Sequence, residues 1–260
     1  MSEMSDKFKR IGYVTDMDVL TRREAEGFLA KFERFIVENG IDLKEPGYRL
    51  HDRHLDVDFI WDLATHPRVL GIVRELVGED DVIMLNSRFI CKTPGGPKAV
   101  PWHCDASYAG LDPAEQVIVW IALDDVNDEN GCLRFLPNSL IPYGSREHVR
   151  PTMRGGTHVS QELPVTTQEE GQAFSIHMKR GNAVAFDGRM VHSSRATSPR
   201  RRRYALALRY IGGNIRLLHH DQWAAVQVGG DGSRVDNDWI FTRESARGFT
   251  YAPPKKFDAI

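Results

Sequence analysis

Apolar residues in the first third of the chain recur at helical spacing. Residues 21–38 carry an apolar side chain every three or four positions, beginning at a Thr21-x-x-Glu24 capping box and ending at Asn39-Gly40. Residues 56–76 show a similar pattern, which is interrupted at His66-Pro67 because the position before proline disfavours helical backbone. The pattern predicts amphipathic helices that need a sheet, or each other, to cover their apolar faces.

After Gly78 the pattern changes to short runs rich in β-branched and aromatic residues, separated by turn residues. No long helical pattern lies between these runs, which favours an antiparallel barrel or sandwich over a parallel sheet. We predict strands over residues 82–91, 117–123, 132–136, 174–177, 183–186 and 204–210. The chain is therefore expected to be mainly β with helical cover.

We expect one domain over residues 1–260, because no linker or internal repeat is visible. Its predicted parts are N-terminal helices at about 17–78, a β core at about 80–212 and a C-terminal segment at about 213–260. Residues 145–172 are a long polar stretch containing Gly155-Gly156. Loops of that length are commonly lids or binding loops, and otherwise disordered insertions, so the sequence leaves an ordered lid open.

Composition narrows the classes of partner. The 260 residues include 34 Lys+Arg and 36 Asp+Glu, a formal net charge of −2, which excludes strong whole-protein attraction to nucleic acid or acidic membranes. No apolar run approaches the ~18 residues that span a bilayer, and no secretory signal is visible, so we expect a cytoplasmic protein. Three cysteines without CxxC spacing are expected to be free thiols. The sequence does not indicate an oligomeric state.

Candidate metal ligands appear among the predicted strands. His103 and Asp105 are two residues apart, so on an extended chain their side chains point to the same face. Such a pair alone is more often a surface hydrogen bond than a metal site. A third candidate, His192, follows a β run and a glycine turn. Two histidines and one carboxylate on a β scaffold are the facial triad of non-haem Fe(II) oxygenases, which leaves coordination positions open.

An arginine 11 residues after His192 adds a second feature. Strand alternation places Arg203, Ala205, Ala207 and Arg209 on one face of the last predicted strand. Small alanines beside an inward arginine are typical of a cavity wall. A guanidinium there suits the carboxylate of a dicarboxylate cosubstrate in a two-pronged, charge-assisted pair.

With these residues the chain resembles the phytanoyl-CoA dioxygenase family of Fe(II)/2-oxoglutarate-dependent dioxygenases. Four passages carry the resemblance: residues 102–105, residues 119–125 with 130–139, residues 181–194 and residues 203–210. The resemblance implies a double-stranded β-helix (jelly-roll, cupin-like) core. One departure is Asn138-Ser139-Leu140, where the family usually reads Gly-Ser-His, so any role of that histidine is absent here.

The resemblance also implies an activity. Fe(II), 2-oxoglutarate and O2 would hydroxylate an unactivated C–H bond of a small polar substrate, with release of succinate and CO2. Halogenating relatives have a small residue in place of Asp105, so a carboxylate there disfavours halogenation. Desaturation, epoxidation and cyclisation stay open.

Roles carry over by position, and no catalytic side chain is implied beyond the metal centre. His103, Asp105 and His192 resemble the iron ligands, and Arg203 resembles the residue that grips the distal carboxylate of 2-oxoglutarate. Weaker likenesses give Ser194, Asn86 and Arg88 a place at the cosubstrate.

Residues with a tentative substrate role are Tyr108, Arg189 and Trp223. Tyr108 is equally well explained by packing at the barrel rim. The run Arg200 to Arg203 lacks a stacking platform and is more often a solvated turn than a nucleic-acid patch. Arginine, histidine and tyrosine near the predicted mouth favour a small polar or anionic substrate over an acyl-CoA.

Two other functions remain open on the sequence. One is a cupin-like metalloenzyme that does not use 2-oxoglutarate, and the other is a noncatalytic barrel that binds a ligand. Arg203, on the same strand face as Ala205 and Ala207, distinguishes an oxygenase from the cupin-like metalloenzyme. Only the oxygenase needs an anchor for the cosubstrate carboxylate in the cavity.

Overall fold

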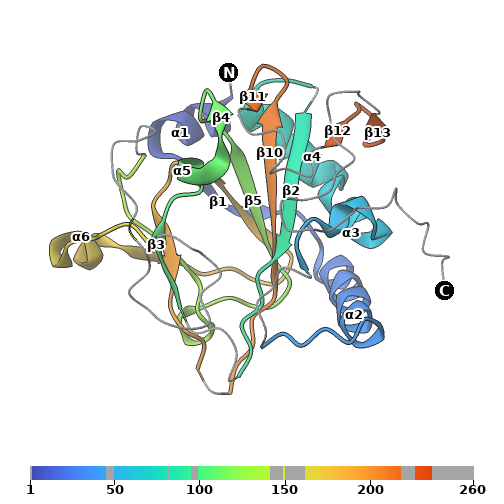
Figure 1. The fold of residues 1–260 in the computed structure, drawn as a ribbon, viewed down its shortest axis with the longest axis horizontal. Helices are drawn as coiled ribbons and strands as arrows, with labels where there is room; N and C mark the ends of the chain where they lie inside the picture. Colours follow the sequence, from blue (N-terminus) through green and yellow to red (C-terminus); the bar gives the residue numbers. More distant parts are fainter. Residues whose placement is uncertain are drawn as a thin grey trace.

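The computed structural model describes residues 2–44, 50–80, 82–94, 99–140, 149, 162–198, 200–217 and 226–235 (Figure 1). Its helices are α1 (Glu3–Ile11), α2 (Arg22–Glu38), α3 (Asp58–Ala64), α4 (Pro67–Val77), α5 (Ala106–Ala109) and α6 (Thr167–Gln172). Its strands are β1 (Tyr13–Asp18), β2 (Val82–Phe89), β3 (Val100–His103), β4 (Leu111–Asp112), β5 (Val117–Ala122), β6 (Leu133–Phe135), β7 (Phe174–Ile176), β8 (Asn182–Asp187), β9 (His192–Ser194), β10 (Ala205–Gly212), β11 (Arg216–Leu217), β12 (Val226–Val228) and β13 (Arg234–Val235).

Two antiparallel sheets form the core. The larger has seven strands in the order β1-β8-β5-β10-β2-β12-β13, and the smaller has four in the order β3-β9-β6-β7. The strands β4 and β11 pair separately. Most neighbours in each sheet are distant in sequence, as expected for a jelly roll. The predicted mainly β fold with helical cover and a jelly-roll core is confirmed.

Side-chain alternation divides the larger sheet into two faces. Val119 and Leu206 face the helices and share a cluster with Phe32, Ile60 and Val73. The alternate residues of the same strands face the smaller sheet, in a second cluster that includes Trp120, Ala205 and Ala207. The predicted alternation along residues 203–210 is confirmed. Figure 1 shows α2, α3 and α4 on the side of the sheet opposite β3.

The predicted helices are present with their predicted ends. Thr21 caps α2: its hydroxyl accepts from the Glu24 backbone at 3.2 Å, and the Glu24 carboxylate accepts from the Thr21 backbone at 2.6 Å. The interruption at His66-Pro67 separates α3 from α4, with Pro67 at the first position of α4, where no intrahelical donor is lost. Gly78 ends α4 with a left-handed φ of 84°.

The six predicted strands match β2, β5, β6, β7, β8 and β10 to within two residues at each end. The predicted boundaries of the N-terminal helices and of the β core need correction. The helix α1 ends before residue 17, and β1 overlaps residue 17. Both β1 and β12 lie outside residues 80–212 but join the larger sheet. β1 was not predicted because a bulge, with Asp16 at a positive φ of 60°, interrupts its alternation.

Most of the long polar stretch at residues 145–172, namely residues 145–148 and 150–161, lies outside the described residues. Its C-terminal end is described and packs on the smaller sheet. Leu163 is 1% exposed, donates from its backbone to the Trp102 carbonyl at 2.7 Å and joins a cluster with Trp102 and Cys104. Cys104 therefore points away from the neighbouring candidate ligands. Within the described chain, no helix combines the length and apolar character needed to cross a bilayer.

Candidate metal centre and cosubstrate cavity

Pairing within the smaller sheet brings two distant histidines together. β3 and β9 are antiparallel neighbours, and His103 lies directly opposite His192. Asp105 follows β3 as the N-cap residue of α5. The next backbone amide, that of Ala106, donates to the Gly188 carbonyl at 2.8 Å, which ties this turn to the loop before β9.

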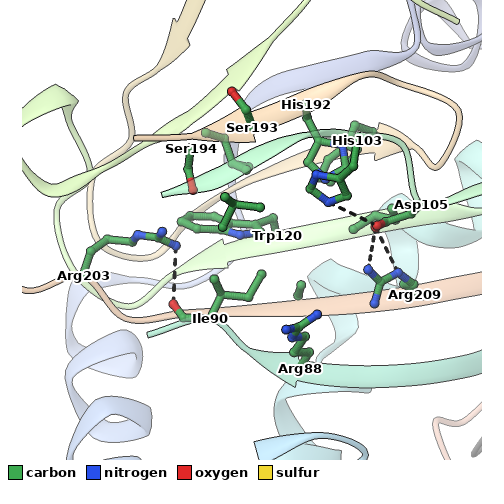
Figure 2. Close-up of a pocket in the computed structure, with 15 residues that line it drawn as sticks. Arg88, Ile90, His103, Asp105, Trp120, His192, Ser193, Ser194, Arg203 and Arg209 are labelled. Atoms are coloured by element: carbon green, nitrogen blue, oxygen red, sulfur yellow. Dashed lines mark hydrogen bonds and ion pairs between the residues drawn. The ribbon is translucent and has the colours of Figure 1, made fainter. Parts of the chain in front are cut away.

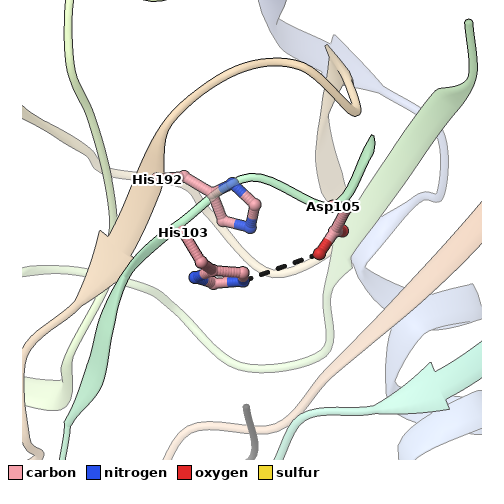
Figure 3. A group of neighbouring side chains, drawn as sticks. All are labelled: His103, Asp105 and His192. Carbon is pink, nitrogen blue, oxygen red and sulfur yellow. Dashed lines mark ion pairs between the residues drawn. The ribbon is translucent and has the colours of Figure 1, made fainter. Parts of the chain in front are cut away.

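The three candidate ligands converge on one point (Figure 3). One ligand atom from each of His103, Asp105 and His192 lies within 4.8 Å of the others. His103 Nε2 is 3.6 Å from Asp105 Oδ1, and the two imidazole centroids are 4.1 Å apart. The side chains are buried, so bulk water does not compete at this point.

Backbone carbonyls orient both imidazoles. Nδ1 of His103 is 2.9 Å from the Pro101 carbonyl, and Nδ1 of His192 is 2.9 Å from the Met190 carbonyl. Because a carbonyl only accepts, each Nδ1 carries the proton and each Nε2 presents its lone pair. Burial lowers the pKa of His192 and lowers that of His103 to about 3, which keeps both rings neutral.

Arg209 holds the carboxylate of Asp105. Two guanidinium nitrogens of Arg209 lie 2.5 and 3.1 Å from Asp105 Oδ2. A third donates to the amide oxygen of Asn86 at 2.9 Å. The buried ion pair engages Oδ2 and leaves Oδ1 facing His103, so the carboxylate presents one oxygen to the triad.

Arg203 lies at the other end of the same cavity (Figure 2). Its side chain is 1% exposed, and no carboxylate of the described residues forms an ion pair with it. Its Nη1 makes one long hydrogen bond of 3.4 Å to the Ile90 carbonyl, and its guanidinium stacks 5.0 Å from the centre of the Trp120 ring. Burial lowers the pKa of Arg203 to about 10, so it keeps its charge at neutral pH.

Two buried nitrogens at this end have no hydrogen-bond partner within the described chain. They are Nε of Arg203 and Nε1 of Trp120. A buried donor without a partner costs about 1–3 kcal/mol, and more when it is charged. This end of the cavity therefore suits an anionic ligand that accepts hydrogen bonds.

The structure brings together most of the residues with a predicted cosubstrate role. Ser194 and Arg88 line the cavity with Arg203, between the two sheets. Asn86 does not line it and contacts Arg209 instead.

Of the three predicted substrate residues, Arg189 is the one whose side chain the structure describes. Arg189 lines a different cavity, beside Gln116 and Asn214, and its guanidinium pairs with Asp187 at 2.7 and 2.9 Å. Trp223 and the side chain of Tyr108 lie outside the described part of the chain.

Sequence reasoning missed two residues of this cavity. Arg209 was placed on the inward face but received no role, although a charged residue inside a barrel needs an opposite charge and Asp105 was the nearest inward candidate. Trp120 lies within the apolar run predicted as a strand, which indicates only a core position, and it both packs in the core and lines the cavity. Periodicity cannot separate these two roles, because both place the side chain inward.

The donor set fits a divalent iron ion. Two neutral imidazoles and one carboxylate leave open positions for a chelating cosubstrate and O2. The carbonyls behind each histidine and Arg209 behind Asp105 are the outer partners that metal ligands usually have. Arg203, at the far end of the cavity, fits the second carboxylate of a dicarboxylate.

Known proteins resemble this chain in sequence. The family model for phytanoyl-CoA dioxygenase (PhyH) matches residues 8–204. A phytanoyl-CoA dioxygenase of Arabidopsis thaliana is 27% identical over 70% of this chain, and the match spans 62% of the plant protein. Phytanoyl-CoA dioxygenase domain-containing protein 1 of Danio rerio is 28% identical over 81% of this chain and 72% of its own length.

Solved structures also match. The non-heme monooxygenase ThoJ in its apo form has a TM-score of 0.74 at 23% identity, covering 97% of this chain and 89% of its own. CytC3 with Fe(II) and alpha-ketoglutarate has a TM-score of 0.66 at 20% identity, covering 97% and 96%. At these identities the likeness shows a shared fold. Because the family model spans more than half of the sequence, the chain belongs to the phytanoyl-CoA dioxygenase family.

Proposed function

We propose that this protein is an Fe(II)- and 2-oxoglutarate-dependent dioxygenase that hydroxylates an unactivated C–H bond of a small polar substrate. His103, Asp105 and His192 would hold the metal, and Arg203 would anchor the cosubstrate. When bound, Fe(II) with 2-oxoglutarate and O2 supplies the oxidation: one oxygen atom enters the substrate, and the other enters succinate as CO2 leaves.

One observation carries the proposal. A buried guanidinium without a carboxylate partner among the described residues lies in the same cavity as a His-Asp-His cluster. A protein that only bound a metal would have no use for this charge, which costs stability unless a ligand neutralises it. A 2-oxoglutarate molecule offers both a metal-chelating end and a free carboxylate.

The residues of the chain have separate tasks in this proposal. The carbonyls of Pro101 and Met190 fix the tautomers of the two histidines, and Arg209 orients Asp105. Arg203, assisted by Ser194, holds the distal carboxylate and so sets the direction in which the cosubstrate lies. Apolar walls limit water around the metal; they are Ile118, Leu133 and Phe186.

The nature of the substrate follows from charge. Arg88 lines the cavity with Asp105 and Arg209, away from Arg203 (Figure 2). Because the charge of Arg209 is paired with Asp105, it is the positive charge of Arg88 that favours a small substrate with a polar or anionic group.

The test has two stages. Anaerobic addition of Fe(II) and 2-oxoglutarate should give a weak visible charge-transfer band, which needs no substrate. Succinate release is then measured with a panel of amino acids, phosphonates and hydroxylated small molecules, with Arg203→Ala as the comparison. A folded wild-type protein without the band contradicts the proposal, and a metal site that ignores 2-oxoglutarate favours the cupin-like alternative.

A further inference from the structure

A second group of ligand-type side chains lies at the end of the β6–β7 pair. Asp128 is in a short 3-10 helix (Asp128–Asn130), Cys132 directly precedes β6, and His177 directly follows β7. One oxygen, one sulfur and one nitrogen from these residues lie within 4.8 Å of one another. None of the three lines the cavity of the triad.

The carboxylate of Asp128 lies between the other two groups. Its Oδ2 is 2.7 Å from His177 Nε2, and its Oδ1 accepts from the Cys132 thiol at 3.5 Å. Ser175 donates its hydroxyl to the same Oδ1 at 2.5 Å. The Asp128 and His177 side chains are about half exposed, whereas Cys132 is buried. Cys132 therefore forms the floor of an open site that ions can reach from solvent.

The backbone holds these positions without a ligand. The Asn127 side chain accepts from the Glu129 backbone amide at 3.0 Å, and the Asn130 side-chain oxygen accepts from the Asn127 backbone amide at 2.9 Å. Gly131 follows with a φ of 75°, and a Cβ there would lie 2.4 Å from the Arg195 carbonyl oxygen. The ladder pair Leu133–Ile176 then places Cys132 beside His177. A preorganised set of donors lowers the cost of binding.

The chemistry of the cluster favours a metal over a reactive cysteine. Cys132 is buried, and its thiol donates to the Asp128 carboxylate at 3.5 Å, so the carboxylate holds the thiol proton in place. A divalent ion would displace that proton, because a coordinated thiol is deprotonated.

We propose that Asp128, Cys132 and His177 form a second divalent-metal site, which prefers zinc-like ions. Zinc binds sulfur, imidazole and carboxylate ligands in tetrahedral sites, with water in a fourth position where three protein ligands are present. The triad of His103, Asp105 and His192 offers no sulfur, so the two sites differ in softness. Ser175 is the outer partner that orients the Asp128 carboxylate.

Cobalt(II) distinguishes the two sites, because a thiolate ligand gives cobalt an intense near-ultraviolet charge-transfer band and the triad has no thiolate. Anaerobic titration of the full chain with cobalt chloride should produce this band as one of two equivalents of metal binds. Cys132→Ser should abolish the band while one equivalent still binds at the triad. Asp105→Ala should keep the band, so this readout is independent of the proposed oxygenase function.

Matched variants sharpen the test. Cys104→Ser, beside the triad, should keep the band. His177→Gln should weaken cobalt binding, and Ser175→Ala should weaken it by about ten-fold; both lie at the protein surface, so the fold is retained. Zinc chloride at one equivalent should displace the cobalt band. A folded wild type without the band, or a band that survives Cys132→Ser or ignores His177→Gln, overturns the proposal.

Discussion

The two ends of the cavity differ in how their polar groups are satisfied. At the triad, each histidine Nδ1 has a backbone carbonyl, and Asp105 has Arg209. At the other end, Nε of Arg203 and Nε1 of Trp120 have no partner within the described chain. The first end is organised by the protein itself. The second is organised for a ligand, because bringing an acceptor there relieves a cost that the fold already carries.

This difference implies different energetics of binding. The metal end needs little rearrangement, since its ligands are already close together and oriented. The Arg203 end gains most from neutralising a buried charge. Substitutions at the triad should therefore abolish binding, whereas substitutions at Arg203 should weaken cosubstrate binding and relieve strain in the free protein.

The largest expected effect is that of Asp105→Ala. The variant removes the anionic ligand and leaves Arg209 buried without its partner, so metal affinity should fall by more than about 100-fold and succinate release should fall to background. Isothermal titration with Mn(II) measures the affinity without turnover. Circular dichroism is the control for folding, and retention of tight Mn(II) binding by the folded variant would place the metal elsewhere.

The next effect is that of Arg203→Met, which removes the charge and keeps the length of the side chain. Loss of a charge-assisted pair of about 1.5–3 kcal/mol corresponds to an increase of roughly 10- to 150-fold in the KM for 2-oxoglutarate. Mn(II) affinity should not change. Because the charge has no carboxylate partner, the free energy of unfolding without ligand should rise by about 1 kcal/mol or more.

Arg203→Lys is the matched control for that variant. A lysine keeps the charge but not the two-pronged geometry, so the KM of this variant for 2-oxoglutarate should lie between those of wild type and Arg203→Met. If Arg203→Met destabilises the free protein, the proposed difference between the two ends is wrong.

A smaller effect is expected for Arg209→Gln. The glutamine keeps a donor near Asp105 but loses the charge and the fork, and outer partners of metal ligands are typically worth 10–100-fold in metal affinity. Asn86 contacts Arg209 and not Asp105, so Asn86→Ala should lower metal affinity by about five-fold or less. Mn(II) titration gives both values. A rise in the KM for 2-oxoglutarate at unchanged metal affinity would instead make Arg209 part of the cosubstrate site.

The sequence predicted the larger sheet better than the strands that carry the ligands. Buried strands such as β5 and β10 have continuous apolar or alternating patterns, which are visible locally. β3 (Val-Pro-Trp-His) and β9 (His-Ser-Ser) are short and carry little apolar pattern. Their extended form depends on pairing with each other and with β6, which lies far away in sequence.

The candidate site shows the same limit. Spacing indicated the triad and Arg203, because those residue types at those intervals match a chemical requirement. Arg209 and Asn86 act through contacts across neighbouring strands β10 and β2, where a bulge between Arg209 and Tyr210 shifts the register. A one-residue shift of this kind changes which side chains meet, and no local pattern predicts it.

The last expected effect concerns the pH dependence of stability and Lys92, which pairs with Arg203 backbone to backbone at 2.8 and 2.9 Å. Burial and the charge of Arg203 lower the pKa of Lys92 from 10.5 to about 6. Between these pH values the unfolded chain holds a proton that the folded chain lacks, so stability should rise as pH increases from 6 to 10.5.

Lys92→Met should remove that pH dependence. The stability of the variant relative to wild type should be greatest near pH 6 and should decline by an amount on the order of a few kcal/mol as pH approaches 10.5. Urea unfolding at several pH values measures this. Adding 2-oxoglutarate with Mn(II) brings a carboxylate to Arg203 and should flatten the wild-type profile. If the free energy of unfolding depends on pH in the same way for wild type and Lys92→Met, then Lys92 stays charged in the folded protein. The Arg203 end of the cavity would then carry less strain than the comparison with the triad end requires.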